Sequence, residues 1–274
     1  MTKAQSRDTR SAPAAADFKQ RLAINLVQWA PVLARAPRAK LPRPRAGAVA
    51  ALMLTLVASV ASMFLLDTTA SEWARHLPHW FTEVFDQITD FGLSGWFLYP
   101  LAFILLGLAV LSSLALPRMT RGVLALIARR VGFLFLAIAL PGLFVTIVKR
   151  MIGRARPFVG GPDDPFLYTP FIWRPAYAAM PSGHATTAAA AAIAIGAIWP
   201  RARPLMWLYA LLIMFSRVVV LAHHPSDVIA GAVVGTVGAL MVRRWFAARH
   251  LVFFASDLRP LPGPSWQRIK SVGR

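Results

Sequence analysis

Three long stretches without a charged residue constrain this chain more than any other feature of its sequence. They cover residues 46–66, 96–116 and 131–148 and contain 21, 21 and 18 residues. A helix rises about 1.5 Å per residue, so each stretch is long enough to cross the hydrocarbon core of a bilayer, which is about 30 Å thick. Because only a helix satisfies its own backbone hydrogen bonds within lipid, the sequence predicts an all-α membrane protein.

Three further apolar segments extend this pattern. Residues 185–199 and 228–242 form uncharged runs of 15, and residues 205–222 form a run of 18 that contains Arg217. A single run of 15 residues also fits a buried helix of a soluble protein. After three clear spans, however, we expect a bundle of six transmembrane helices.

The composition excludes several other classes of protein. Hydrophobic residues make up 57% of the chain and charged residues only 15%, whereas ordinary soluble domains contain about 25% charged residues. Disorder over the whole chain is therefore excluded. The chain contains no Cys, which excludes a disulfide scaffold, a thiolate metal site and a Cys nucleophile. The net charge of +19 still needs an explanation.

The distribution of Lys and Arg predicts how the chain is oriented in the membrane. Residues 1–45 contain ten basic residues and the segment after residue 242 contains seven, whereas the loop 67–95 has one basic residue and five acidic ones. Because basic loops stay in the cytoplasm, both termini are expected there. We expect three parts: a basic N-terminal segment (1–45), a six-span domain (46–242) and a basic cytoplasmic tail (243–274).

The N-terminal segment is expected to contain no signal peptide, because the first long apolar run begins only at Ala46. Residues 1–16 are polar and Ala-rich, which predicts disorder. Apolar residues then recur at helical spacing: Phe18, Leu22, Leu26, Trp29 and Leu33. This pattern fits either a helix lying on the membrane surface or a helix packed on the protein's own cytoplasmic face.

One loop breaks the charge rule. The segment 149–184 should lie on the non-cytoplasmic side, yet it carries five basic residues: Lys149, Arg150, Arg154, Arg156 and Arg174. Arg217, inside a predicted span, poses the same question, because a charge within the membrane indicates a functional site by default. Either the topology is wrong or these cations have a role that outweighs the orientation bias.

Three short segments place reactive side chains at the predicted non-cytoplasmic ends of spans. In the first, Lys149 is followed after six residues by Arg156-Pro157. The second is the run 181–184, Pro-Ser-Gly-His. The third joins Ser216-Arg217 to His223 after five residues and to Asp227 after three more. In the six-span topology, all three segments meet at one membrane face.

The residue types in these segments suit an oxyanion. Lys149, Arg156 and Arg217 supply three cations, and Arg can bind a phosphate through two parallel hydrogen bonds. Ser182 and Gly183 lie at a predicted helix start, where free N–H groups and the helix dipole favour an anion.

The same segments also contain acid–base groups. His223 and Asp227 are four residues apart and share one face of a helix, where the carboxylate can fix the tautomer of the imidazole. His184 supplies a second imidazole, so one His can attack and the other can donate a proton.

Together the three segments resemble the complete signature of the type 2 phosphatidic acid phosphatase superfamily: K-x6-R-P, P-S-G-H and S-R-x5-H-x3-D. The resemblance implies a mechanism that needs no metal and no cofactor. In it His223 attacks phosphorus, Asp227 orients His223, and His184 protonates the leaving oxygen and later activates water. The phosphoryl oxygens are held by Lys149, Arg156, Ser182, Gly183 and Arg217.

The resemblance implies an integral-membrane phosphatase that hydrolyses a phosphomonoester or pyrophosphate on a lipid. We expect it in a bacterial inner membrane, with the site facing the periplasm. The expected substrates are phosphatidylglycerophosphate, phosphatidate, a polyprenyl pyrophosphate or a lipid A phosphate. Gly183 is slight evidence against an undecaprenyl pyrophosphatase, because the undecaprenyl pyrophosphatases of this superfamily often carry Asp at this position.

Two rival functions stay open. One is a phosphotransferase on the same fold, which passes the phosphoryl group to a lipid or sugar hydroxyl. The other is a basic membrane protein that binds anionic lipid without catalysis. We expect no nucleic-acid partner, because the sequence shows no base-stacking or groove-reading element outside the tails.

For other conspicuous residues we expect ordinary structural roles. Arg150 and Arg154 lie outside the motif and are expected to form a solvated flank, and so is His224 beside the motif His. Asp163 and Asp164 are expected to form a solvated turn rather than a metal site. Three Gly residues of the last span indicate close helix packing: Gly231, Gly235 and Gly238. Four aromatic residues indicate an interfacial belt or helix: Trp80, Phe81, Phe85 and Trp96.

Overall fold

A computed structural model describes residues 19–20, 22–25, 34–44, 46–114 and 116–262. Eight α-helices make up most of this part of the chain: α3 (Ala46–Leu65), α4 (Asp67–Arg75), α5 (His79–Asp90), α6 (Gly95–Ser112), α7 (Arg118–Ile152), α8 (Gly183–Ile198), α9 (Arg203–Val219) and α10 (Pro225–Ala248). Two short 3-10 turns, η1 (Pro175–Tyr177) and η2 (Pro200–Ala202), lie before α8 and α9. The predicted all-α class is confirmed.

Five helical stretches are long and apolar enough to cross a membrane. They are α3, α7, α10, the stretch His79–Ser112 that contains α5 and α6, and Pro200–Val219, which contains α9. The remaining apolar helix, α8, has 16 residues and is about 24 Å long. The protein is thus an all-α membrane protein with five candidate spans among the described residues, and the expected sixth span is a shorter helix.

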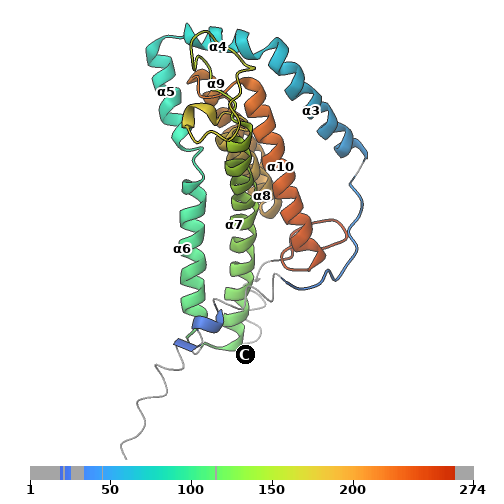
Figure 1. The fold of residues 1–274 in the computed structure, drawn as a ribbon. Coiled ribbons are helices and arrows are strands. Elements are labelled where there is room, and N and C mark those ends of the chain that lie inside the picture. The colour runs from blue at the N-terminus through green and yellow to red at the C-terminus, as the bar shows by residue number, and fades with distance from the viewer. Residues whose placement is uncertain (1–18, 21, 26–33, 45, 115, 263–274) are drawn as a thin grey trace, which may run out of the picture.

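The short helix α8 lies at the centre of the bundle, packed against α7, α9 and α10 (Figure 1). Half of its residues are Ala, and those from Ala188 to Ala192 are at most 1% exposed. Small side chains let neighbouring helices approach closely, and a helix buried on all sides needs no polar face. Because α8 is enclosed by longer helices, its length need not match the thickness of the lipid.

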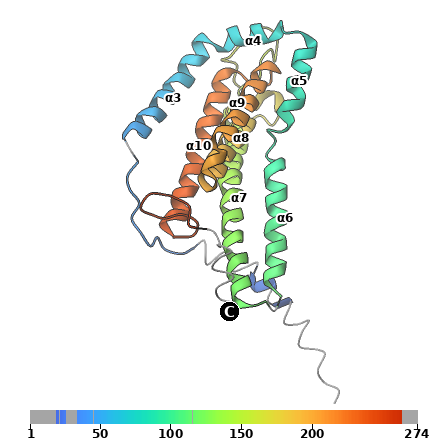
Figure 2. The same cartoon turned by 180° about the vertical axis from the view of Figure 1, so that it is seen from behind.

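The outer helices carry the side chains that suit contact with lipid. Large apolar residues stay well exposed on α3, α6 and α9, among them Leu54, Phe103 and Leu208, which are 70%, 71% and 64% exposed. So many exposed apolar side chains would be unusual on a soluble protein. Seen from behind in Figure 2, α3 and α6 flank the bundle on opposite sides.

The segment between the first two apolar runs forms helices rather than an open loop. It contains α4 and α5, and α5 packs on α9. The rings of Phe81 and Phe85 lie 4.8 Å apart, and those of Phe85 and Phe215 lie 5.4 Å apart. Two of the aromatic residues expected in an interfacial belt or helix, Phe81 and Phe85, therefore join α5 to α9.

Two helices extend beyond their predicted ends. Helix α7 begins at Arg118, so it includes basic residues that the sequence placed in a connection, and α10 continues to Ala248 rather than ending at residue 242. After α10 the chain folds back, and the buried ring of Phe253 packs 4.8 Å from that of Phe133. The beginning of the expected tail is therefore part of the core.

Most of the predicted N-terminal helix lies outside the described residues. Residues 19–20 and 22–25 are helical, and the Asn25 side chain donates a 2.8 Å hydrogen bond to Ser113 Oγ, just after α6. This contact joins the N-terminal segment to the protein itself.

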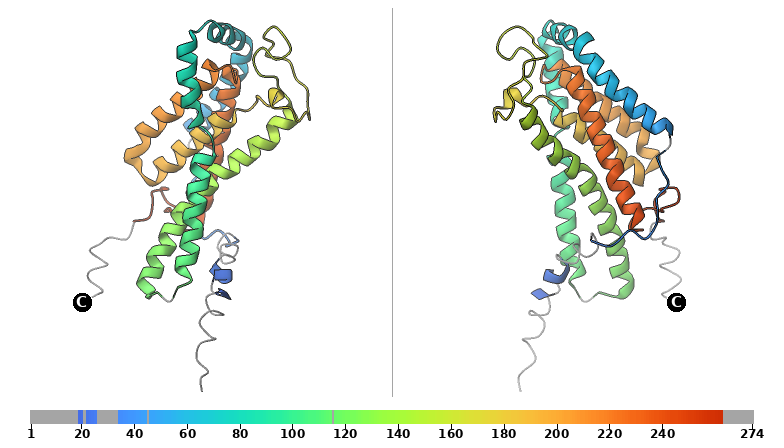
Figure 3. Two further views of the ribbon diagram at one scale, coloured as in Figure 1. Left: turned by 90° about the vertical axis from the view of Figure 1, so that its left-hand side faces the viewer. Right: turned by 45° about the vertical axis from the view of Figure 1, so that its right-hand side comes forward.

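Four helix ends meet at one end of the bundle: the C-termini of α7 and α9 and the N-termini of α8 and α10. Figure 1 shows them at the top, below α4, and the turned views of Figure 3 show the α7–α8 connection beside them. Backbone hydrogen bonds support this convergence, because Ser182 N donates to Asp227 O and Ala179 N donates to Arg154 O. All three sequence motifs lie here.

Candidate active site

The third motif is held by a tight turn between α9 and α10. His223 N donates to the carbonyl of Arg217, and Leu221 adopts a positive φ of 53° to make the turn. His224 is the N-cap of α10, and its backbone N–H donates a 2.9 Å hydrogen bond to Oδ2 of Asp227. This capping box fixes the Asp227 carboxylate at the helix start.

The predicted pair of His223 and Asp227 forms. His223 Nδ1 lies 3.7 Å from Asp227 Oδ2, and the two side chains are 4% and 0% exposed. Nδ1 has no hydrogen-bond partner among the described residues, so it contacts the carboxylate without a hydrogen bond, and the pair is an ion pair only when the imidazole is protonated. Because Nδ1 faces the carboxylate, Nε2 is the ring nitrogen left for another partner.

Burial lowers the pKa of His223 below its ordinary value, although Asp227 opposes this effect. The imidazole is therefore neutral at neutral pH, which is the form that can act as a nucleophile.

The second motif forms the beginning of α8. Ser182 is the N-cap, and its Oγ accepts a hydrogen bond from Ala185 N at 3.5 Å. A Cβ added to Gly183 would meet nothing within 4 Å, whereas one added to Gly231 of α10 would lie 2.4 Å from the Ser182 carbonyl oxygen. The second motif therefore packs tightly on α10 and leaves open space beside Gly183.

His184 joins the three motifs electrostatically. It interacts with Arg217 and His223 of the third motif and with Lys149 and Arg156 of the first. A Cβ added to Gly92, in the turn between α5 and α6, would lie 2.9 Å from His184 Cδ2. The structure therefore brings the predicted charged site residues together, next to the end of α5.

The three predicted cations come from different elements. Lys149 lies in the last turn of α7, and Arg156 follows in the connection to α8. Arg217, in the last turn of α9, is 7% exposed, and its Nη1 donates a 2.6 Å hydrogen bond to Thr89 Oγ1 of α5. Thr89 thus orients a motif Arg, although nothing in the sequence singled it out.

The expectation for Arg154 was wrong, because this side chain is completely buried. Its Nε donates to the carbonyl of Pro165 at 2.9 Å, and its Nη atoms bond to Asp67, Ser226 and Asp227. Burial lowers the pKa of Arg154, but Asp227 and Asp67 outweigh burial and raise it. The sequence did contain one indication that Arg154 has a special role, because it lies in the basic segment 149–184 on the predicted non-cytoplasmic side.

The expectations for His224 and Asp163 were also wrong. Both side chains are at most 1% exposed, and His224 Nε2 lies 3.1 Å from Asp163 Oδ1. The other ring nitrogen, Nδ1, lies 3.6 Å from Asp227 Oδ2. Burial opposes protonation of His224, but the two carboxylates together raise its pKa. Asp163 also accepts a hydrogen bond from Phe158 N.

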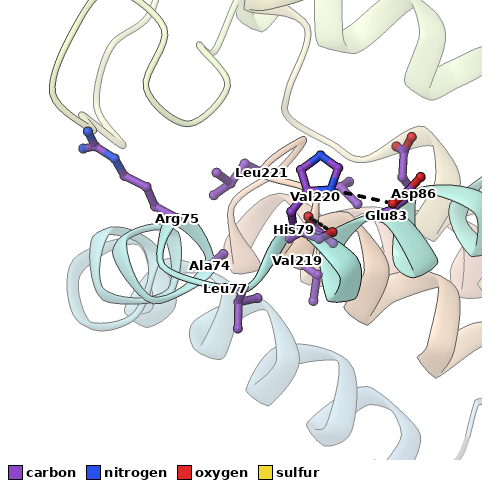
Figure 4. Close-up of a pocket in the computed structure, with 10 residues that line it drawn as sticks. Ala74, Arg75, Leu77, His79, Glu83, Asp86, Val219, Val220 and Leu221 are labelled. Atoms are coloured by element: carbon purple, nitrogen blue, oxygen red, sulfur yellow. Dashed lines mark hydrogen bonds and ion pairs between the residues drawn. The ribbon is translucent and has the colours of Figure 1, made fainter.

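A pocket of about 600 Å³ lies beside the site, between the beginning of α5 and the end of α9 (Figure 4). The stretch 219–221, which joins Arg217 to His223, forms one wall. Polar side chains of α4 and α5 line the other wall: Arg75, His79, Thr82, Glu83 and Asp86. His79 Nδ1 lies 3.6 Å from Glu83 Oε2.

The chain is similar to known proteins over most of its length. Residues 130–251 match the PAP2 superfamily. The lipid A 1-phosphatase of Rhizobium johnstonii is 34% identical over 236 residues, which are 85% of this chain and 95% of that protein. The lipid A 1-phosphatase of Rhizobium etli is 34% identical over 227 residues, which are 82% of this chain and 96% of that protein.

Two further similarities are more distant. A decaprenylphosphoryl-5-phosphoribose phosphatase of Mycobacterium tuberculosis is 33% identical over 135 residues, which are 49% of this chain and 67% of that protein. The crystal structure of a PAP2-type phosphatidylglycerolphosphate phosphatase from Bacillus subtilis superposes on this structure with a TM-score of 0.49 and 21% sequence identity. The superposition covers 71% of this chain and 93% of the Bacillus chain. Because the two Rhizobium proteins are 34% identical to this chain over more than four fifths of its length, the chain belongs to the PAP2 superfamily and is a membrane lipid phosphatase.

Proposed function

We propose that this phosphatase removes a phosphate from a saccharide-bearing lipid of the lipid A class, through a phospho-histidine intermediate on His223 and without a metal ion. The observation that carries the proposal is the pairing of buried His223 with Asp227 beside His184 and three cations. A neutral imidazole, a second imidazole and a cluster of cations are the groups that phosphoryl transfer through a covalent intermediate requires.

In the first step His223 Nε2 attacks phosphorus, and the bond between phosphorus and the lipid oxygen breaks. His184 donates a proton to that oxygen as it leaves. Burial and then the surrounding cations disfavour the imidazolium form of His184, whereas the charge of the bound phosphate favours it. Asp227 stabilises the positive charge that develops on His223.

In the second step His184 takes a proton from water, and the water oxygen attacks phosphorus. The bond between phosphorus and Nε2 breaks, inorganic phosphate leaves, and both His residues return to their starting forms. Lys149, Arg156 and Arg217 hold the phosphoryl oxygens, together with the N-terminus of α8 at Ser182 and Gly183.

The choice of lipid rests on the relatives and on the pocket. The lipid A 1-phosphatases match this chain over nearly their whole length, whereas the prenyl-linked relative matches over 67% of its own. The pocket beside the site offers the carboxylates of Glu83 and Asp86. Carboxylates accept hydrogen bonds from sugar hydroxyls and repel a second phosphate close by.

A panel of lipid phosphates in detergent tests this function. Purified protein should release inorganic phosphate fastest from lipid A, compared with phosphatidate, phosphatidylglycerophosphate and undecaprenyl pyrophosphate, and His223→Ala should serve as the blank. Activity should persist in EDTA. Faster release from undecaprenyl pyrophosphate would favour the prenyl-linked class. Release only after addition of a hydroxyl acceptor would favour a phosphotransferase.

A further inference from the structure

The buried polar network behind His223 contains two charged residues that lie in none of the motifs, Arg154 and Asp67. Both side chains are 0% exposed. Arg154 Nη1 donates to Asp227 Oδ1 at 2.5 Å and to Ser226 Oγ at 2.7 Å, and Nη2 donates to Asp67 Oδ2 at 2.8 Å. One guanidinium thus lies between two buried carboxylates.

Asp67 reaches this network from a distant part of the chain. It begins α4, directly after the first span, and its Oδ1 accepts hydrogen bonds from Ser226 N at 3.0 Å and Ser62 Oγ at 3.2 Å. Its Oδ2 accepts a hydrogen bond from Ser226 Oγ. Asp67 is therefore fixed against the start of α10, where Asp227 also lies.

The two oxygens of Asp227 have different partners. Oδ1 faces Arg154, whereas Oδ2 accepts the His224 N–H and faces His223 Nδ1 at 3.7 Å. With both carboxylates ionised, Asp67, Arg154 and Asp227 together carry one net negative charge, and His223 lies next to it.

We propose that Arg154 and Asp67 are positioning residues that set the negative charge Asp227 presents to the nucleophile His223. The inference rests on the proposed role of His223. Arg154 offsets part of the Asp227 charge, and Asp67 offsets part of the Arg154 charge, so their balance decides how strongly a proton is held on His223. Neither residue touches the phosphate in this scheme.

Removing the charge of Arg154 and removing the charge of Asp67 should change the net charge beside His223 in opposite directions. Without Arg154, two carboxylates remain and the net charge becomes −2, which favours protonation of His223. Without the charge of Asp67, Arg154 and Asp227 cancel, which disfavours protonation of His223. A network that only anchored α3 and α4 to α10 would predict lower stability in both cases, without this reversal of sign.

Other charged groups also act on His223 from the surrounding elements. Arg217 of α9 and Arg156 of the α7–α8 connection disfavour its protonation, and His184 of α8 interacts with it. His224, which pairs with Asp163, faces the same Asp227 oxygen as His223, with His224 Nδ1 3.6 Å from Asp227 Oδ2. None of these residues is replaced in the variants considered, so differences between variants report the combined charge of Asp67, Arg154 and Asp227.

The experiment compares the pH dependence of kcat/KM for phosphate release from lipid A in detergent, for the full chain and for Arg154→Met and Asp67→Asn. The acid limb reports protonation of the free enzyme's essential base. We expect it to move up by about one pH unit in Arg154→Met and down by a similar amount in Asp67→Asn. The titration of the substrate phosphate is common to all variants and cancels.

The kinetic constants provide a second readout. Because neither residue contacts the phosphate, KM should stay within about twofold in Arg154→Met. Because the charge that Asp227 presents to His223 changes, kcat should fall about tenfold or more. Arg203→Met is the matched control, since this Arg bonds the Gly196 carbonyl at the far end of α8. Its acid limb should not move.

Arg154→Met leaves two buried carboxylates without a cation and can fail to fold. The double variant Arg154→Met with Asp67→Asn retains the net charge of −1, and its acid limb should return toward the wild-type value. Asp67→Asn alone also tests the direction in which the acid limb of kcat/KM moves. Shifts of the two single variants in the same direction, or no shift in Asp67→Asn, would overturn the inference. Loss of phosphate release from the wild type, or its retention in His223→Ala, would instead overturn the proposed function.

Discussion

At the residue scale, Asp227 is the group on which the buried charges converge. Its carboxylate contacts Arg154 on one oxygen and the His224 N–H on the other, and it lies within 4 Å of both imidazoles. A buried carboxylate is stable only with such partners. The residue proposed to orient the nucleophile is thus also the N-terminal anchor of α10.

Two adjacent His residues differ in what their ring nitrogens can reach, and this difference gives the first prediction. His224 is fully buried with Nε2 against Asp163, whereas His223 Nε2 is the proposed nucleophile. After an alkaline quench with radiolabelled lipid phosphate, the wild type should carry an acid-labile phosphoryl label, and His223→Ala should lose it together with about 1000-fold or more of the activity. His224→Gln should retain the label. Labelling of His223→Ala would contradict the assignment.

The second prediction concerns pH. The nucleophile must be unprotonated, and burial lowers the pKa of His223 from the ordinary value of 6.5. On the acid side, activity is therefore lost as the pH falls through this lowered value, so the acid limb of kcat/KM should lie below pH 6.5. A pH–rate profile in detergent measures it. A limb above pH 7 would mean that the Asp227 charge outweighs burial.

The third prediction concerns stability. The carboxylates around His224 raise its pKa above 6.5, so their stabilising effect is complete below about pH 6.5 and is lost as the pH rises through the raised value. Asp163→Asn should lower the melting temperature more at pH 6 than at pH 9. Asp164→Asn, beside it on the exposed side of the turn, is the matched control. Equal losses at both pH values would contradict a charged His224.

At the element scale, α8 is positioned by small residues on both sides of its contact with α10. A Cβ added to Gly235 would lie 2.2 Å from the Thr186 carbonyl oxygen, whereas a Cβ added to Gly107 of α6 would meet nothing within 4 Å. The close approach holds the second motif against the third, because Thr186 Oγ1 also donates to the Gly231 carbonyl at 3.0 Å. Helix packing and site geometry thus depend on the same contact.

The fourth prediction follows from that contact. Gly235→Ala should destabilise the protein by about 1–3 kcal/mol through overpacking and should lower kcat, because α10 carries Asp227. Gly107→Ala should be neutral or stabilising by about 0.5–1 kcal/mol, since Ala is the better helix former. Thermal unfolding in detergent distinguishes the two. Equal effects would mean that α8 and α10 can separate at little cost.

At the scale of the whole molecule, the site lies at one end of the bundle and the basic start of α7 at the other (Figure 3). The excess of basic residues in the terminal segments predicts that this other end is cytoplasmic. With this orientation, the substrate would reach the site from the outer half of the bilayer.

The fifth prediction tests this orientation. A periplasm-active reporter fused at Gly161, in the α7–α8 connection, should be active, and the same reporter fused at residue 115, between α6 and α7, should be inactive. The reverse pattern would place the site in the cytoplasm and would give the basic termini a different explanation.

Much of the fold was predictable because it depends on local composition. An uncharged run of 21 residues predicts a membrane-spanning helix, and α3 begins and ends within one residue of its predicted limits, whereas α6 ends four residues before the end of its run. The helical form of α4 was not predicted, and a helix was one of two interpretations of the aromatic residues in α5, because both sequences mix charged and aromatic residues and both helices pack against α9. The extension of α10 to Ala248 was also missed, since Arg243 and Arg244 resemble the end of a span.

The sequence by itself determined the membrane class, the three motifs and the chemical types of the site residues, because span length and motif spacing are properties of neighbouring residues. Only the tertiary structure decided that Arg154, Asp67 and His224 are buried partners of Asp227. Burial depends on which segments pack together, and Asp67 lies 160 residues from Asp227 along the chain. A basic residue next to a motif looks the same in sequence whether it faces lipid headgroups or a buried carboxylate.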